Sequence, residues 1–339
     1  MTDATRGAEP TDPPPLRRIA IIGAGAMGAS LAALASPHVP TVLVVRNAQR
    51  ARRIRAAGIV LDGRLQGSGR PEVADSIDDL EHIHPIDLVF IATKTTAIPS
   101  VCEALRPHLS ELPFLVSYQN GIEPGREIIQ TLGTPRVVRM VLNYGAVLEG
   151  SLDADAALRV RATLHAPPHF VGGEGAEAPA FARALAPRLT AMGLPTRFTE
   201  AIDREVWRKG LANAASNPVA ALVRASLGEL VASPAQPLIV RLLDEGLAVA
   251  EAAGIDVGPG FREEALKRMA EGAAHRPSMA QDVTEGRPTE ITQLNEQIAA
   301  RGAALDVPTP THDTIVELIR TFDWRVAGGQ SGGGTDAPS

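Results

Sequence analysis

One stretch decides the fold: Ile19-Ala20-Ile21-Ile22-Gly23-Ala24-Gly25-Ala26-Met27-Gly28, an apolar run followed directly by three spaced glycines. The pattern predicts a buried strand that turns into a helix. In such a turn, Gly23 allows the sharp change of direction, Gly25 lets the backbone approach phosphates, and Gly28 lets the helix pack on the strand. The helix then offers free N–H groups and a positive dipole end to an anion. The sequence therefore predicts a dinucleotide site built from Gly23, Ala24, Gly25, Ala26, Met27 and Gly28.

The same stretch has a second interpretation. Arg17-Arg18 before a long uncharged run also resembles a twin-arginine signal peptide or a short membrane span. Several small residues lower the hydrophobicity of this run, however, and a second strand candidate at 41–45 follows after a helix-length interval. Both observations favour the dinucleotide fold.

The residue after that second strand indicates which dinucleotide binds. An acid there bonds a ribose 2′-hydroxyl, whereas an arginine accepts a 2′-phosphate. The residue is Arg46, and neither Asp nor Glu occurs among the residues from Asn47 to Arg50. We therefore expect NADPH as the cofactor. The alternative is that Arg46 and Arg50 are ordinary solvated residues at a helix start.

Composition bounds the function. The chain of 339 residues is 45% hydrophobic and 21% charged, which is typical of a globular protein large enough for two domains. A net charge of −6 and few aromatic residues argue against binding nucleic acid. The single cysteine, Cys102, excludes an intrachain disulfide and most zinc sites. We expect a cytoplasmic protein with no metal site and no membrane partner, and place its histidine pairs in loops: His82 with His84, and His165 with His169.

The order of predicted elements defines two domains. Apolar runs at 87–92 and 113–117 have the length of strands buried on both faces. With the first two strands they predict an α/β fold with a Rossmann-type doubly wound parallel sheet, over residues 16–199. From about residue 200 the periodicity becomes helical, which predicts an all-helical C-terminal domain for substrate binding and dimerisation over 200–326.

Further boundaries follow from the same patterns. Apolar positions between 239 and 250 trace one face of a helix. The proline-rich residues 1–15 and the glycine-rich residues 327–339 predict a disordered leader and a flexible tail. Other helices are expected over 203–225, 260–273, 288–303 and 309–322.

A polar stripe marks the first of these helices. Lys209, Asn213 and Asn217 recur every four residues and so lie along one helical face. The stripe could face solvent. Alternatively, Lys209 is a general acid whose pKa is lowered by desolvation in a cleft, and the asparagines hold the substrate or the lysine. A junction between two domains is a preferred place for such a cleft.

Three other segments carry groups that could do chemistry. Asn120-Gly121 follows the strand at 113–117, at the edge where open α/β sheets bind ligands, although the dipeptide is also a common turn. Lys94 holds the corresponding place after 87–92 and could face the cofactor or the reacting centre. The segment 287–290, Arg-Pro-Thr-Glu, is typical of a helix start, with proline first and an acid in the first turn.

Taken together, these segments resemble the ketopantoate reductase (2-dehydropantoate 2-reductase) family over about residues 18–325. The matching blocks stand in family order and at near-family spacing. They are 23–28, 45–46, 92–94, 119–121, 207–209 with Asn213 and 217–218, 278–282, and 287–290.

The resemblance implies an activity and a role for each residue. The enzyme would use NADPH to reduce a small 2-oxo acid, 2-dehydropantoate, to (R)-pantoate, a step towards pantothenate and coenzyme A. Lys209 would protonate the carbonyl oxygen, and Asn120 would position that lysine and the nicotinamide. Glu290 would bond the pantoate hydroxyl and complete the catalytic group. The remaining implied roles are substrate binding by Asn213, Asn217 and Ser278, and cofactor binding by Arg46 and Lys94.

Some positions depart from the family pattern. Asn143-Tyr144 lacks the histidine-alanine pair expected in many members, His275 stands where some carry an asparagine, and Pro277 replaces a serine. The substrate could therefore be another branched 2-oxo acid. Alternatives outside the family are an opine or 6-phosphogluconate type dehydrogenase, whose catalytic residues would differ, and a non-catalytic NADPH sensor. A homodimer through an exposed apolar helix face is also compatible with the sequence.

Overall fold

The computed structural model describes residues 16–82, 85–108, 114–150 and 155–328. The leader predicted at 1–15, nearly all of the tail predicted at 327–339, His84 and Pro113 lie outside these residues. Among the described helices, none is both long and apolar enough to cross a membrane.

A sheet of eight strands forms the centre of the N-terminal part, in the order β12-β11-β8-β7-β6-β1-β2-β5. Neighbouring strands are parallel except β8 and β11, which are antiparallel. The four predicted strands are confirmed as β1, β2, β6 and β7. The strand bounds are β1 Ile19–Ile22, β2 Thr41–Val44, β5 Glu72–Ala74, β6 Leu88–Ile91, β7 Phe114–Ser117, β8 Val137–Val141, β11 His169–Gly173 and β12 Thr196–Phe198.

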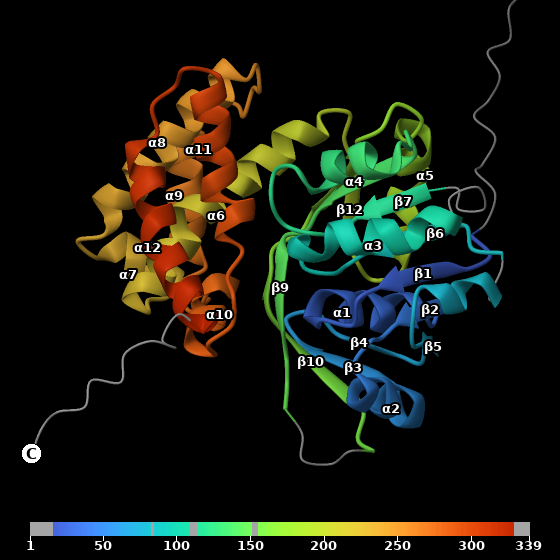
Figure 1. The fold of residues 1–339 in the computed structure, drawn as a ribbon. Coiled ribbons are helices and arrows are strands. Elements are labelled where there is room, and N and C mark those ends of the chain that lie inside the picture. Colours follow the sequence, from blue (N-terminus) through green and yellow to red (C-terminus); the bar gives the residue numbers. More distant parts are fainter. Residues whose placement is uncertain (1–15, 83–84, 109–113, 151–154, 329–339) are drawn as a thin grey trace, which may run out of the picture.

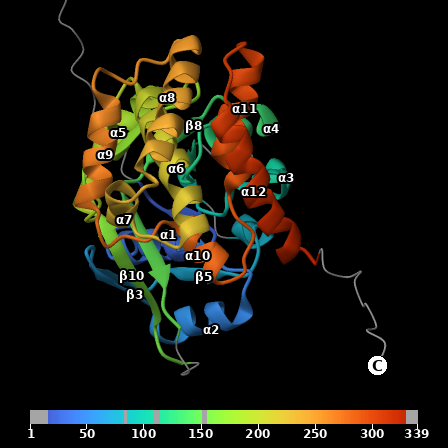
Figure 2. The same ribbon diagram turned by 90° about the vertical axis from the view of Figure 1, so that its left-hand side faces the viewer.

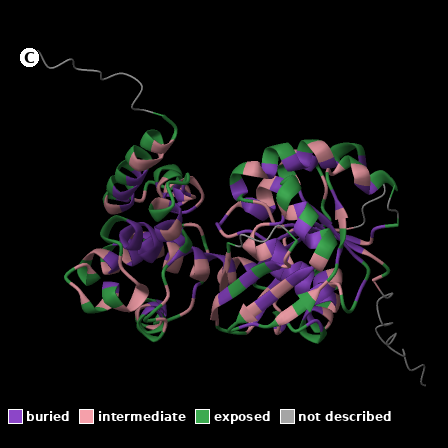
Figure 3. Ribbon diagram, turned by 90° about the horizontal axis from the view of Figure 1, so that it is seen from below, coloured by how far each residue is buried: buried purple, intermediate pink, exposed green. Residues whose placement is uncertain are grey.

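Helices cover both faces of this sheet, as the predicted doubly wound fold requires. Ile19 and Ile21 of β1 pack with α1 (Ala26–Ala35) and α5 (Pro179–Ala191). Ala20 and Ile22 point the other way, towards α3 (Ile98–Leu105) and α4 (Pro124–Leu132). Because both faces are buried, the strands read as continuous apolar runs. Figure 3 shows the buried residues concentrated along these strands.

A second sheet of four strands, which was not predicted, packs on α1 in the order β4-β3-β10-β9. The strands are β3 (Ile59–Gly63), β4 (Gly67–Gly69), β9 (Tyr144–Leu148) and β10 (Leu158–His165). Its best sequence signal is the alternation in β10, where Leu158, Val160 and Ala162 are buried and the arginines between them are exposed. The loop assignment for His165 and His169 is wrong, because they end β10 and begin β11.

The C-terminal part is helical and lies beside the carboxyl edge of the larger sheet (Figures 1 and 2). The helices expected at 203–225, 260–273 and 309–322 correspond to α6, α9 and α12, and positions 239–250 lie in α8. The change from strands to helices falls between Phe198 and Ile202; the division into two domains there stays a prediction. The helix bounds are α6 Ile202–Val223, α7 Leu227–Ala232, α8 Gln236–Ala252, α9 Phe261–Glu271, α10 Ser278–Thr284, α11 Asn295–Ala304 and α12 Pro310–Val326, with α2 at Ala48–Ala57 in the N-terminal part.

The helix predicted over 288–303 is wrong in its first two turns, because α11 begins only at Asn295. The backbone N–H and the hydroxyl of Thr289 both donate to the carboxylate of Asp323 on α12, at 2.8 Å each. These bonds hold the chain in an irregular conformation, followed by a short 3-10 turn at Ile291–Gln293. The expected helix start at 287–290 is therefore an irregular segment anchored to α12.

Pro218 inside α6 explains how α11 docks. Proline has no N–H, so the carbonyl of Ala214 lacks its usual helical donor. The side-chain amide of Asn295, fully buried at the start of α11, donates to that carbonyl at 2.9 Å. This bond sets the segment that carries Glu290 against the polar stripe of α6.

Candidate active site

The glycine-rich turn between β1 and α1 has the shape of an anion cradle. Gly23 has a φ of +109°, which side chains rarely allow. A Cβ on Gly28 would lie 1.9 Å from the carbonyl oxygen of Gly23, so the helix can pack there only without a side chain. A Cβ on Gly25, the N-cap of α1, would meet no atom within 4 Å. The space beside Gly25 is therefore open, and the first N–H groups of α1 have no partners within the helix.

Two arginines that follow β2 have different environments. Arg46 is exposed, two residues after the end of β2. Arg50 instead donates from Nη1 to the carbonyl oxygen of Ala24 at 2.7 Å, and burial lowers its pKa. The idea that both are merely solvated is therefore wrong for Arg50, which ties α2 to the glycine-rich turn. The binding of a 2′-phosphate by Arg46 stays a prediction.

Lys209 reaches from α6 to the carboxyl edge of the larger sheet. Its Nζ donates to Oδ1 of Asn120 at 2.7 Å and to the carbonyl oxygen of Leu142. Asn120 follows β7 and Leu142 follows β8, so the ammonium group sits between the ends of two neighbouring parallel strands. A solvent-facing stripe is therefore wrong for Lys209.

The surroundings of Lys209 suit proton donation. Burial lowers its pKa to about 7; the nearby Arg139 charge acts in the same direction and Glu290 acts against it. A lysine with this pKa is partly protonated at neutral pH and gives up its proton readily, as a general acid must.

Arg139 is a charged residue that the sequence interpretation missed. It lies in the middle of β8 with only 2% of its surface exposed. Its guanidinium donates from Nη1 to Oγ of Ser117 at 2.6 Å and from Nη2 to the carbonyl oxygen of Gly121 at 2.7 Å. The available signal was a single charge inside the otherwise apolar run 137–141.

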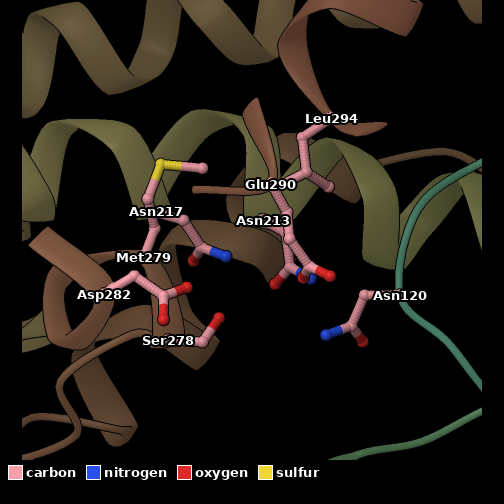
Figure 4. Close-up of a pocket in the computed structure, with 8 residues that line it drawn as sticks. All are labelled: Asn120, Asn213, Asn217, Ser278, Met279, Asp282, Glu290 and Leu294. Carbon is pink, nitrogen blue, oxygen red and sulfur yellow. The ribbon is translucent and has the colours of Figure 1, made fainter. Parts of the chain in front are cut away.

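A cavity lined mainly by polar residues opens beside Asn120 (Figure 4). Asn120 comes from the sheet part, and the other lining residues come from α6, α10 and the segment before α11. The lining residues are Asn120, Asn213, Asn217, Ser278, Met279, Asp282, Glu290 and Leu294. The structure thus gathers five of the predicted site residues around one cavity and adds Met279, Asp282 and Leu294. Lys209 lines an adjoining cavity that shares Asn120.

Glu290 provides a carboxyl group in this wall. Its Oε1 accepts a hydrogen bond of 3.4 Å from the hydroxyl of Thr95. Burial raises its pKa, and the charge of Lys94 opposes that shift. Amides, a hydroxyl and carboxylates facing one cavity are the groups that hold a small hydroxy or oxo acid.

Lys94 bridges the two parts of the chain. Its Nζ lies 3.4 Å from both carboxylate oxygens of Asp282 on α10 and 3.2 Å from the carbonyl oxygen of Pro288. Asp282 also accepts from Nε of Arg287 at 2.8 Å. The predicted contact of Lys94 with the cofactor stays a prediction.

Two of the positions that depart from the expected family pattern, Tyr144 and His275, contact elements of the N-terminal part. The Tyr144 hydroxyl lies 3.1 Å from that of Tyr118 and 3.4 Å from the carbonyl oxygen of Met27 in the glycine-rich turn. His275 packs against Gly145 in β9, where a Cβ would come within 3.0 Å of the imidazole. Neither Tyr144 nor His275 is among the residues that line the cavity beside Asn120.

Comparison with known proteins identifies two matching family models. Residues 19–166 match the model described as "Ketopantoate reductase PanE/ApbA", and residues 201–323 match the model of its C-terminal part. A curated relative, a 2-dehydropantoate 2-reductase from Mesorhizobium japonicum, is 27% identical over 327 residues, which cover 89% of this chain and 97% of the relative.

Solved structures share the whole fold. A PanE/ApbA family ketopantoate reductase from Ralstonia eutropha JMP134 superposes with a TM-score of 0.77 at 25% identity, covering 91% of this chain and 99% of the other. A D-mandelate dehydrogenase, solved with NADH and anilino(oxo)acetate, has a TM-score of 0.79 at 22% identity over the same shares of the two chains.

Proposed function

Since this chain belongs to the ketopantoate reductase family of nicotinamide-dependent oxidoreductases, we propose that it uses NADPH to reduce 2-dehydropantoate to (R)-pantoate in pantothenate biosynthesis. The observation that carries the proposal is the setting of Lys209. Its ammonium group is held by Asn120 beside a polar cavity, with a pKa of about 7. A cytoplasmic location and a homodimer belong to the same proposal; Leu318 and Trp324 on α12 are exposed apolar side chains.

The glycine-rich turn fits the cofactor. The open space at Gly25 and the N-terminus of α1 would receive the pyrophosphate, and Arg46 would bind the 2′-phosphate. When bound, NADPH supplies a hydride to the carbonyl carbon of the substrate.

Lys209 supplies the proton. As the carbonyl oxygen gains negative charge, the N–H of Lys209 stabilises it and then transfers the proton to it, which leaves a neutral amine. Asn120 and Leu142 accept two of the three ammonium hydrogens, so the third is directed by those two bonds. The amine regains a proton from solvent before the next turnover.

The cavity wall orients the substrate. Asn213, Asn217 and Ser278 offer donors for a carboxylate, and Glu290 offers an acceptor for a hydroxyl. Met279 and Leu294 offer apolar contact for a branched chain. The departures at His275 and Pro277 support a second candidate within the family, the reduction of another branched 2-oxo acid. A non-catalytic NADPH sensor is the candidate outside enzymes.

The test measures NADPH oxidation by the purified protein with 2-dehydropantoate and with a panel of other branched and aromatic 2-oxo acids. We expect turnover of 2-dehydropantoate, and a fall of at least about a hundredfold in kcat for Lys209→Ala, because general acids contribute about 10²–10⁴-fold. Lys267→Ala, which removes an exposed lysine on α9, is the matched control.

Each outcome separates the candidates. Turnover of a different acid would retain the mechanism and change the substrate. NADPH binding without turnover of any acid would favour the sensor. Full activity of Lys209→Ala would overturn Lys209 as the acid.

A further inference from the structure

Arg139 places a positive charge inside the sheet, in the same enclosure as Lys209. Fully buried arginines are rare because the guanidinium must be desolvated, so one is retained only where it makes specific bonds. Arg139 and Lys209 line a common cavity, next to the one that holds the proposed substrate-binding groups. The proposed mechanism assigns Arg139 no task.

The bonds of Arg139 brace the turn that carries Asn120. Its Nη1 donates to Oγ of Ser117, which in turn donates to Oε1 of Gln119 at 3.0 Å. Its Nη2 donates to the carbonyl oxygen of Gly121, a glycine with a φ of +100°. One guanidinium thus holds residues on both sides of Asn120, whose own amide oxygen accepts from Lys209.

The charge of Arg139 also acts on Lys209 directly. After burial, this charge is the next cause that lowers the pKa of Lys209. Burial lowers the pKa of Arg139 itself to about 10, which leaves the guanidinium charged at neutral pH. Two cations sharing an enclosure disfavour the protonated lysine and so favour release of its proton.

Other titratable groups near Arg139 and Lys209 also influence the charges of this pair. Glu174, Asp203 and Glu123 offset part of the burial of Arg139, and Arg126 forms ion pairs with all three of these acids. On the side of Lys209, Glu290 favours the protonated lysine. Another neighbour of Lys209 is His169, whose pKa of about 3 keeps it neutral at working pH.

We propose that Arg139 is a positioning residue for the reduction: its guanidinium fixes the turn that carries Asn120, and its permanent charge promotes transfer of the proton from Lys209 to the carbonyl oxygen. This rests on the proposed function only in taking Lys209 as the acid.

The charge effect can be measured without substrate. The chain has three lysines, Lys94, Lys209 and Lys267, so NMR of protein labelled at lysine Cε resolves few signals, and Lys209→Met assigns one of them. In Arg139→Gln we expect the pKa of Lys209 to rise above 7. In Arg139→Lys, which keeps the charge, we expect it to stay near 7. Arg136→Gln removes an exposed arginine just before β8, paired with Glu177, and should leave the titration unchanged.

The bracing effect is measured by kinetics with whichever 2-oxo acid the enzyme reduces. Arg139→Lys cannot make both bonds of the guanidinium fork, so we expect kcat to fall about tenfold or more through misplacement of Asn120. In Arg139→Gln we also expect the alkaline limb of the rate profile to move to higher pH. Ser117→Ala removes one anchor and keeps the charge; it should lower kcat without moving that limb.

Clear results would overturn the proposal. An unchanged pKa of Lys209 in folded Arg139→Gln contradicts the charge effect, and wild-type kcat in both Arg139→Lys and Ser117→Ala contradicts the bracing. If Arg139→Gln does not fold, the other two variants decide the bracing, and raised Lys209 pKa in Arg139→Lys would contradict the charge effect. Failure of 2-dehydropantoate as substrate leaves the titration unaffected, so the two proposals fail separately.

Discussion

At the residue scale, the site depends on charged side chains whose hydrogen bonds and pKa values are set by their neighbours. The ammonium of Lys209 is held by two oxygens, and burial keeps its pKa near the working pH. Arg50, which looks equivalent to Arg46 in the sequence, is occupied by the carbonyl oxygen of Ala24. The position of an arginine in the sequence therefore does not tell whether it is available to a ligand. The hydrogen bonds that its side chain makes in the folded protein do tell this.

Arg46 carries a prediction about the cofactor. Arg46→Ala should raise the KM for NADPH about tenfold or more and leave the KM for NADH nearly unchanged, because only NADPH has the 2′-phosphate and a charge-assisted hydrogen bond contributes about 1.5–3 kcal/mol. Steady-state kinetics with both cofactors measures this. Arg52→Ala on α2, also an exposed arginine, is the control. Equal changes for NADPH and NADH would contradict the assignment.

At the element scale, the turn from β1 to α1 separates the demands of folding from those of binding. Gly28 is required by packing, since a Cβ there would meet the backbone of Gly23. Gly25 faces open space, so the folded chain itself sets no steric limit there. The two glycines belong to one motif, but we expect the free energy of unfolding to depend on Gly28 and the free energy of NADPH binding to depend on Gly25.

A pair of alanine substitutions tests this separation. Gly28→Ala should destabilise the protein by at least about 1–3 kcal/mol, the usual effect of overpacking, because the clash is with backbone. Gly25→Ala should unfold at nearly the wild-type temperature but bind NADPH weakly, since its methyl group would occupy the space left for phosphate. Thermal denaturation and fluorescence titration with NADPH give the two readouts. A stable Gly28→Ala, or tight NADPH binding by Gly25→Ala, would refute the corresponding role.

At the scale of the whole molecule, the site exists because distant segments meet. The end of β7, the stripe on α6 and the irregular segment before α11 converge on one cavity. That segment is held by Asp323 of α12, and its position relative to α6 by Asn295. Buried histidines lie in the same framework: His169 accepts the backbone N–H of Asn143 beside the site.

His169 predicts how global stability depends on pH. Its folded pKa is about 3 against about 6.5 when unfolded, so between these values the unfolded chain binds more protons. The contribution of His169 to the free energy of unfolding should therefore be fully present above pH 6.5 and should fall as the pH drops towards 3. His275 and His312, whose pKa values burial also lowers, add to the loss.

Urea denaturation at pH 7.5 and at pH 4.5 measures this dependence. His169→Gln should reduce the difference between the two values, because glutamine does not titrate. His38→Gln, an exposed histidine, should leave the difference unchanged. An unaltered pH dependence in His169→Gln would show that this histidine is not its source.

Local patterns in the sequence determined much of this protein. The glycine spacing after β1, the apolar runs of the central strands and the four-residue repeat on α6 predicted the Rossmann-type sheet, the helical C-terminal part and the family. These succeeded because each depends on residues close in the chain, whose geometry is set by helix and strand periods.

Only the tertiary structure decided the rest. The second sheet pairs strands almost a hundred residues apart, and the expected helix at 287–290 gave way to bonds with Asp323, which no local pattern contains. The bonds of Arg139 and the pKa of Lys209 likewise depend on burial and on partners brought in from other elements. Periodicity states which face of an element is apolar, but burial and pairing between elements are properties of the assembled chain.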